Sequence, residues 1–327
     1  MRKIPPLNVS VIGYGCMGLS HAYGSPPSRA AAKQVIHEAM DLGIDFFDTA
    51  NLYGYGENEM LVGETLKPVR SKIFLASKGG LAVRDANGNL TRGIDSSPDN
   101  IKRSCEESLK RLQTDYLDLY YLHRWDKNTP IEDCVMALAD LVREGKIRRV
   151  GLCEISAETL RKANDVHPIA ALQCEYSLWT RDPEAGTLEA CSEIGAAFVC
   201  YSPIARGFLS NAVADPETLP KGDLRRNMPR FAAENYKENR ALLSKYLSIA
   251  DEVGCTPSQL ALAWLLHRPW AVCPIPGTTS ITHLRENAGA AEVKLSQEVT
   301  QRLEQLINSE TISGARYNEV TMAELDR

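Results

Sequence analysis

Residues 44–59 read IDFFDTANLYGYGENE, and this stretch passes from an apolar strand through a glycine-rich loop into a helix. The run from Ile44 to Asp48 is short and aromatic, as in a strand that is covered on both faces. The glycines at 54 and 56 interrupt the pattern before a polar helix start. A strand followed directly by a helix is the building unit of a parallel sheet.

The same unit recurs along the chain. Runs of β-branched and apolar residues alternate with segments whose apolar residues lie three and four apart, such as Ile101, Cys105 and Leu109. The expected strands are Val9 to Gly13, Ile44 to Asp48, Ile73 to Lys78, Tyr116 to His123, Arg149 to Cys153, Ala170 to Glu175, Phe198 to Ser202 and Val272 to Pro274. We expect one helix after each strand. Eight such units predict an α/β fold, a single (β/α)8 TIM barrel domain over residues 1–327, although the pattern alone also permits an open doubly wound sheet.

Residues typical of helix starts and one long connection lie between these strands and helices. A hydroxyl precedes a proline at Ser97, Thr129 and Thr256, which predicts a capped helix after each. The connection from Ile204 to Glu238 is much longer than the others, and connections of this length usually carry function or are disordered.

The composition excludes several classes of function. Lys and Arg number 37 against 42 Asp and Glu, a formal net charge of -5, and no basic stripe is present, so nucleic acid is not an expected partner. No 18-residue apolar run and no signal-peptide pattern occur, so we expect no membrane association and a cytoplasmic location. The nine cysteines are odd in number and form no CxxC pair, which favours reduced core residues over disulfides or a metal site.

Four polar residues fall at or just beyond the ends of expected strands. Asp48, Lys78 and His123 each end a strand, and Tyr53 follows Asp48 by five positions. Each alone is compatible with a structural role, as a helix cap, a solvated cation or a packed ring. In a βα barrel, however, the carboxyl ends of the strands meet at one rim, which is where active sites lie. The sequence therefore predicts that these side chains converge.

Residues 48–59 resemble the signature of the aldo-keto reductase family, in which an Asp and a Tyr share one loop. The similarity continues through residues 13–18, 172–177, 201–203 and 274–278. The stretches 123–126, 145–148 and 223–231 further resemble a branch of NADPH-dependent enzymes that reduce aldehydes, including pyridoxal-like ones. The resemblance implies a (β/α)8 barrel that reduces an aldehyde or ketone to an alcohol by hydride transfer from NAD(P)H. It also implies the catalytic residues Asp48, Tyr53, Lys78 and His123.

The chemistry explains why these side chains occur together. Hydride arriving at a carbonyl carbon leaves negative charge on the oxygen, so a proton donor is needed there, and Tyr53 suits that role as general acid. We expect the Lys78 ammonium to lower the pKa of the Tyr53 phenol, and Asp48 to keep that lysine charged. His123 is expected to orient the carbonyl, although its protonation state is not readable from sequence.

The resemblance implies NADPH as cofactor, with NADH as the open alternative. Tyr201 is expected to stack on the nicotinamide, Gln173 to bind its carboxamide, and Glu286 and Asn287 to approach the adenine. The implied cofactor-binding residues are Gly15, Met17, Asp48, Cys153, Gln173, Tyr201, Ser202, Pro203, Ile204, Arg206, Gly207, Gly277, Thr278, Thr279, Ser280, His283, Glu286 and Asn287. The run GYGCMG at 13–18 is not a Rossmann fingerprint, because no suitable acid follows about 20 residues later.

Two features depart from the family pattern. Cys153 stands where the family usually has serine, and a thiol is a weaker hydrogen-bond donor. The positions of Gly277, Ser280 and His283, where NADPH-preferring members often carry Lys or Arg, supply no dependable cation for a 2′-phosphate. Arg285, or an arginine of the long connection such as Arg225, is the expected substitute.

The substrate pocket is expected to have aromatic walls. Tyr23, Tyr55, Trp125 and Trp179 follow the first, second, fourth and sixth strands, and a small carbonyl compound is the expected partner. Nothing in the sequence indicates the oligomeric state. The alternative function is a regulatory barrel similar to a channel β-subunit, which binds NADPH with little turnover. A barrel dehydratase or isomerase is a third possibility.

Overall fold

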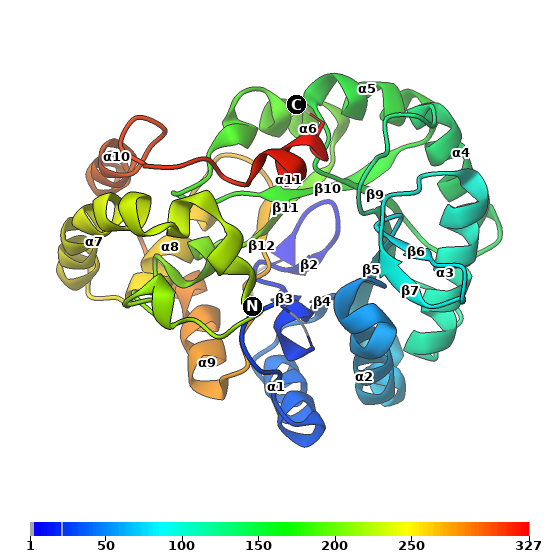
Figure 1. The fold of residues 1–327 in the computed structure, drawn as a ribbon, viewed down its shortest axis with the longest axis horizontal. Coiled ribbons are helices and arrows are strands. Elements are labelled where there is room, and N and C mark those ends of the chain that lie inside the picture. Colours follow the sequence, from blue (N-terminus) through cyan, green and yellow to red (C-terminus); the bar gives the residue numbers. More distant parts are fainter. Residues whose placement is uncertain (1–2, 21, 327) are drawn as a thin grey trace.

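Eight parallel strands form the centre of the structure, and Figure 1 shows the helices arranged around them. The computed structural model describes residues 3–20 and 22–326. The central strands are β3 (Tyr14–Gly15), β4 (Phe46–Asp48), β5 (Phe74–Gly79), β8 (Leu119–Leu122), β9 (Val150–Cys153), β10 (Ile169–Glu175), β11 (Ala197–Tyr201) and β12 (Val272–Pro274). Each pairs with the next in chain order, and the Gly13 amide donates to the Pro274 carbonyl at 2.9 Å, which joins the two edges. The predicted (β/α)8 barrel is confirmed.

The helices depart from one per strand in the last third of the chain. They are α1 (Arg29–Asp41), α2 (Glu57–Leu66), α3 (Pro98–Leu112), α4 (Ile131–Arg143), α5 (Ala157–Val166), α6 (Thr187–Ile194), α7 (Ala233–Val253), α8 (Pro257–Leu266), α9 (Ile281–Gly289), α10 (Gln297–Leu306) and α11 (Glu319–Ala323). Two helices follow β11 and three follow β12, so the expectation of one helix per strand is wrong there. The last of them, α11, is drawn in red in Figure 1, and Glu324 at its end forms an ion pair with Arg92.

Two antiparallel hairpins are added to the barrel. The first pairs β1 (Lys3–Ile4) with β2 (Val9–Ser10), and the second pairs β6 (Ala82–Arg84) with β7 (Leu90–Arg92). The predicted first barrel strand, Val9 to Gly13, is therefore misplaced, since its first two residues belong to a hairpin. The apolar run is buried throughout, so its pattern does not distinguish a hairpin from the adjoining barrel strand.

The long connection is less irregular than expected. It contains four 3-10 turns, and α7 begins at Ala233, so the last residues of the expected loop are helical. Cap chemistry at Ser97 and Thr256 is confirmed, because each accepts a main-chain hydrogen bond at its helix start. Thr129 does not cap α4, since its hydroxyl donates to Asp126 at 3.1 Å and Pro130 holds the cap position.

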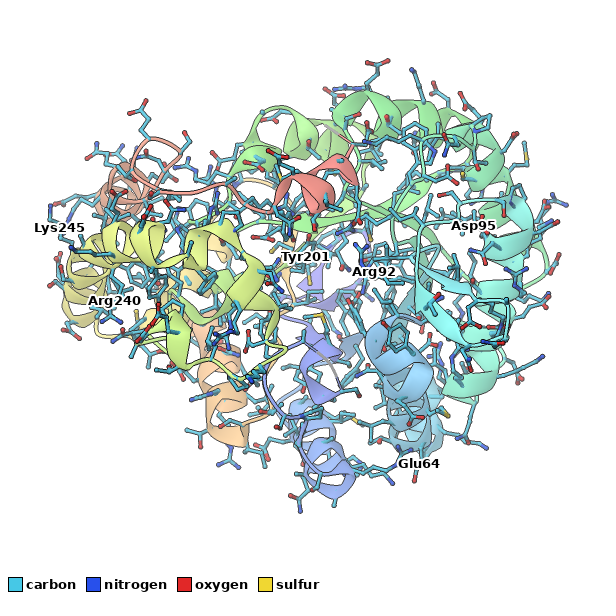
Figure 2. The ribbon with its side chains drawn as sticks, viewed as in Figure 1. Glu64, Arg92, Asp95, Tyr201, Arg240 and Lys245 are labelled. Atoms are coloured by element: carbon cyan, nitrogen blue, oxygen red, sulfur yellow. The ribbon has the colours of Figure 1, made fainter. Side chains whose placement is uncertain are left out.

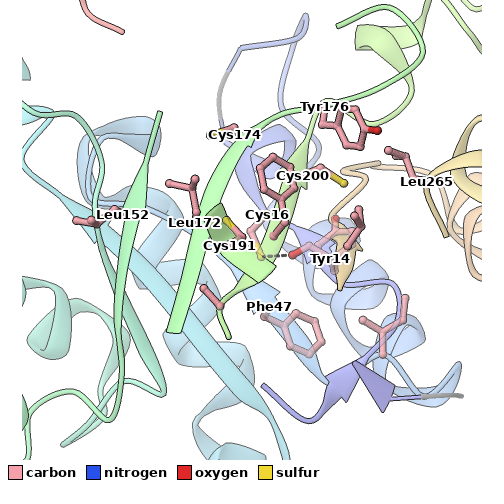
Figure 3. Packing of buried hydrophobic residues seen from close by; sticks show 14 of the residues in the cluster. Tyr14, Cys16, Phe47, Leu152, Leu172, Cys174, Tyr176, Cys191, Cys200 and Leu265 are labelled. Atoms are coloured by element: carbon pink, nitrogen blue, oxygen red, sulfur yellow. Dashed lines mark hydrogen bonds between the residues drawn. The ribbon is translucent and has the colours of Figure 1, made fainter. Parts of the chain in front are cut away.

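Alternate residues of the strands pack on opposite faces of the sheet. Phe46 faces the interior of the barrel, whereas Phe47 packs with the residues between strands and helices, among them Tyr14 and Cys200 (Figure 3). All nine cysteines are free and eight are buried in the described part of the chain. Among the described residues, no helix combines the length and apolar character needed to cross a bilayer.

The junction between β3 and β12 depends on glycine. A Cβ atom at Gly15 would lie 2.7 Å from the Ile275 carbonyl oxygen, which is main chain and has little room to move. We expect Gly15→Ala to lower the free energy of unfolding by about 1–3 kcal/mol, measured by chemical denaturation. Gly18→Ala is the matched control, since its Cβ would meet nothing within 4 Å. Equal stabilities for the two variants would show that the junction tolerates a methyl group.

Candidate active site

The four strand-end residues meet at one point. Asp48 ends β4, Lys78 precedes the end of β5 by one residue, and His123 directly follows β8. The Lys78 ammonium forms an ion pair with Asp48 and donates to the Tyr53 hydroxyl at 3.2 Å and to the Thr49 carbonyl at 3.0 Å. The Tyr53 and His123 rings stand edge to face, with centroids 6.0 Å apart. The structure thus brings together all four predicted side chains.

The ion pair at the centre of this group is shielded from water. The Lys78 side chain is 0% exposed and that of Asp48 is 2% exposed. Gln173 donates to the second Asp48 oxygen at 2.8 Å, so both carboxylate oxygens are engaged. Burial lowers the pKa of Lys78, but the Asp48 carboxylate together with Tyr53 and Cys153 outweighs that effect, and the net pKa lies above its ordinary value. Lys78 is therefore an ammonium at neutral pH.

The ionisation of Tyr53 differs from the expectation. Burial raises the pKa of its phenol, and the Lys78 ammonium lowers it by less, so the net pKa lies above 10.0. The expected direction of the shift is thus wrong for this structure, because desolvation of the phenolate outweighs attraction to the lysine. The phenol keeps its proton at neutral pH, as a general acid must.

His123 is neutral in this environment. Burial, with the Lys78 ammonium and the Arg124 guanidinium, holds the pKa of its imidazole well below 6.5. Its buried Nδ1 has no hydrogen-bond partner among the described residues. Buried polar atoms without partners are rare in folded proteins, and they mark positions where a ligand or water completes the bonding.

A cavity of about 760 Å³ opens onto these residues at the carboxyl ends of the strands. Figure 2 places Tyr201 and Arg92, two of its lining residues, near the centre of the barrel end. The predicted cofactor residues that line it are Gly15, Met17, Asp48, Cys153, Gln173, Tyr201, Ser202, Pro203, Ile204, Arg206, Gly207, Gly277, Thr278 and Thr279. The volume and the mixed lining suit a small-molecule site.

The loop after β11 has an unusual backbone. Ser202, Ala205 and Arg206 adopt φ values of 50°, 49° and 56°, and Gly207 has φ 92°. Non-glycine residues adopt such angles at a cost in free energy, and they cluster at ligand sites. This loop lines the cavity, as does the Tyr201 ring that precedes it. A strained loop beside an aromatic wall fits the diphosphate and the flat ring of a dinucleotide.

Four predicted cofactor residues lie outside the cavity lining. Ser280 caps α9 by accepting from the His283 amide at 3.3 Å, so this turn serves as an ordinary helix cap. The Glu286 carbonyl accepts from Gln259 at 3.1 Å, and Asn287 is buried in the helix packing. The cavity lining does not test whether these four residues contact the cofactor, so the four contacts stay predictions.

The expected partners of a 2′-phosphate are already paired. Arg285 lies on the surface of α9 and donates to Glu38 at 2.7 Å. Arg225, from the long connection, lines the cavity and forms an ion pair with Asp223 at 2.7 Å. A 2′-phosphate would therefore have to compete with, or join, an existing carboxylate contact.

Only one of the four expected aromatic walls lines the cavity, namely Tyr23. Tyr55 is 51% exposed on the surface, and the Trp125 indole donates to the Thr129 carbonyl at 2.7 Å. Trp179 stacks on Phe208 with centroids 4.1 Å apart and belongs to the core. These three rings lie outside the cavity lining, and for Trp125 and Trp179 the reason is that an aromatic ring after a strand satisfies core packing as well as a pocket wall.

The segment after α10 supplies a wall that the sequence did not indicate. Tyr317 lines the cavity and donates to Glu175 at 2.8 Å. Arg316 forms a buried ion pair with Glu154, whose oxygen also accepts from the Tyr201 hydroxyl at 2.7 Å. These contacts fix the Tyr201 ring at the cavity. No local motif marks Arg316 or Tyr317, so only their long-range pairing identifies them.

Comparison with known proteins assigns the whole arrangement to one family. The model of the aldo/keto reductase family matches residues 11–308. An aldo-keto reductase of Schizosaccharomyces pombe, named with NADP(+), is 43% identical over 97% of this chain and 94% of its own length. A glycerol dehydrogenase from Gluconobacter oxydans aligns with a TM-score of 0.85 and 27% identity over 97% of both chains. An aldo/keto reductase from Klebsiella pneumoniae, solved in complex with NADP and acetate, aligns with a TM-score of 0.72 and 28% identity. The alignment covers 94% of this chain and 96% of that chain.

The buried ion pair makes a prediction about stability. Lys78→Met would leave the Asp48 carboxylate buried without its counter-ion, and we expect a loss of about 3–5 kcal/mol in the free energy of unfolding. Adding Asp48→Asn to Lys78→Met removes the unpaired carboxylate charge and should recover part of the lost free energy. Denaturant unfolding of the single and double variants measures both. A double variant less stable than Lys78→Met would contradict the assignment.

Proposed function

This chain belongs to the aldo-keto reductase family, as an NADPH-dependent oxidoreductase that reduces carbonyl compounds, and we propose that Tyr53 is its proton donor. The observation that carries the proposal is the buried contact chain from Asp48 through Lys78 to the Tyr53 hydroxyl at the cavity. We propose an aldehyde as the preferred substrate, because apolar side chains such as Leu52 and Met228 line much of the cavity.

The roles of the side chains follow from their charges. When bound, NADPH supplies the hydride that reduces the carbonyl carbon. Tyr53, protonated at neutral pH, gives its proton to the carbonyl oxygen as negative charge develops there. The Lys78 ammonium at 3.2 Å stabilises the phenolate that remains, and Asp48 holds that ammonium in position. Gln173 fixes the carboxylate through its second oxygen.

The environment of His123 supports a role for this residue in orienting the substrate. Its imidazole is neutral, lines the cavity and stands edge to face with the Tyr53 ring, so an N–H group beside the phenol can donate to the same carbonyl oxygen. The hydrogen position on the ring is set by its partner, which here would be the substrate. The regulatory alternative, which could keep the same site, is not favoured, because the relatives of this chain are named as aldo-keto reductases.

Replacement of the donor tests the proposal directly. We expect Tyr53→Phe to lower kcat for aldehyde reduction by roughly 10²- to 10⁴-fold, the usual contribution of general acid catalysis. NADPH affinity, measured by quenching of protein fluorescence, should stay within a few-fold because the hydroxyl alone is removed. Tyr55→Phe, at an exposed position outside the cavity lining, is the matched control. A kcat retained in Tyr53→Phe would exclude Tyr53 as the donor.

The two shifted pKa values predict the pH profile of kcat. The active form has Tyr53 protonated and His123 neutral. Because the pKa of Tyr53 lies above 10.0, activity is lost only as the pH rises past that value, and because the pKa of His123 lies below 6.5, protonation of the ring begins only in more acid solution. We expect a plateau from pH 6.5 to pH 10 in steady-state assays. A loss of activity that begins near neutral pH on the alkaline side would contradict the assignment of Tyr53, and one that begins there on the acid side would contradict that of His123.

A further inference from the structure

Most arginines at the cavity have a carboxylate partner. Arg92 pairs with Glu324 at 2.5 Å, and Arg206 pairs with Glu175 at 2.6 Å. Arg225 is held by Asp223 in the same way. Arg124 also lines the cavity, yet within residues 3–20 and 22–326 it forms no ion pair with any carboxylate.

The surroundings of Arg124 leave its guanidinium largely unbonded. The residue is 8% exposed, its Nη1 donates to the His123 carbonyl at 2.8 Å, and its buried Nε has no partner in the described structure. A guanidinium has five N–H donors in a planar fork, so most of its bonding capacity remains free. The side chain is thus nine-tenths buried, charged and directed to the cavity.

Two buried carboxylates, Glu154 and Glu175, are already bonded to other side chains. Glu154 accepts from Arg316 through both of its oxygens and from the Tyr201 hydroxyl. Glu175 accepts from Arg206 at 2.6 Å and from the Tyr317 hydroxyl at 2.8 Å. A new bond from Arg124 to either carboxylate would compete with a filled contact.

A buried charge without a partner is costly, and a ligand that supplies the opposite charge removes that cost. Carboxylates match the planar fork of arginine through two parallel hydrogen bonds. We propose that Arg124 binds a carboxylate carried by the carbonyl substrate. This inference rests on the proposed function and narrows its substrate class to aldehydes or ketones that bear an acidic group.

Arg124 lines the same cavity as the proposed proton donor. It directly follows His123, which stands beside Tyr53, and all three residues line one cavity. One molecule bound in this cavity can therefore place its carbonyl oxygen at the Tyr53 hydroxyl and its carboxylate at Arg124. Short acidic aldehydes, aliphatic or aromatic, meet this requirement.

The test compares acids with their neutral esters. We expect the enzyme to reduce one of the isomers 3- and 4-carboxybenzaldehyde with a higher kcat/KM than the corresponding methyl ester. Arg124→Gln should lower kcat/KM for that acid by roughly 10- to 100-fold, the effect of losing a charge-assisted pair, and should change the ester far less. Arg124→Lys keeps the charge without the fork and should give an intermediate ratio.

Arg143→Gln, at an exposed arginine on α4, is the control for a general effect of charge and should leave the ratio of acid to ester unchanged. Far-ultraviolet circular dichroism and NADPH affinity establish that Arg124→Gln is folded. The proposal is overturned if acid and ester are reduced equally well by the unaltered protein. It is also overturned if Arg124→Gln slows both alike, for example by weakening NADPH binding.

A binding measurement separates this inference from the proposed function. Calorimetric titration of the NADPH complex with 3- and 4-carboxybenzyl alcohol, the products of the reaction, requires no turnover. Tight binding that is lost in Arg124→Gln supports the carboxylate site even if no aldehyde is reduced, in which case the proposed function alone fails. Turnover of the esters together with equal product binding by both proteins would overturn the carboxylate site and leave the proposed function standing.

Discussion

The buried ion pair between Lys78 and Asp48 is the interaction on which the site depends. Two charges removed from water are tolerated only when each is fully bonded, and here the pair is completed by Gln173, Thr49 and Tyr53. The pair and its partners come from three strands or the loops that follow them, β4, β5 and β10. The pair therefore fixes the relative positions of separate barrel strands while it holds the Tyr53 hydroxyl at the cavity.

A second set of buried charges performs a similar task at the other side of the cavity. Glu154 directly follows β9 and Glu175 ends the neighbouring strand β10, and each is bonded to an arginine and a tyrosine. Burial alone would raise the pKa of Glu175, but the neighbouring guanidinium groups lower it to about 2. Both carboxylates are thus charged at neutral pH and bonded to other side chains, and neither forms an ion pair with Arg124 in the described part of the protein.

The sequence predicts the barrel and its four central residues because both depend on local patterns. Apolar runs mark the strands, and the topology of a βα barrel brings strand ends such as Asp48 and His123 to one rim. The features that the sequence does not predict depend on contacts between residues far apart in the chain. An aromatic residue after a strand fits the core or the pocket equally well, so the place of Trp179 is decided by its stacking on Phe208. The pKa of Tyr53 likewise follows from the depth of burial, which no spacing reveals.

The wall formed by residues 316–326 also sets an order of events during synthesis. Arg316 is added to the chain 162 residues after Glu154, its buried partner. At a synthesis rate of about 5–20 residues per second, Arg316 is therefore synthesised roughly 8–30 seconds after Glu154. Every barrel strand has by then left the ribosome or lies within its exit tunnel. The cavity is therefore finished last, and a nascent barrel acquires this wall only when translation of this segment ends.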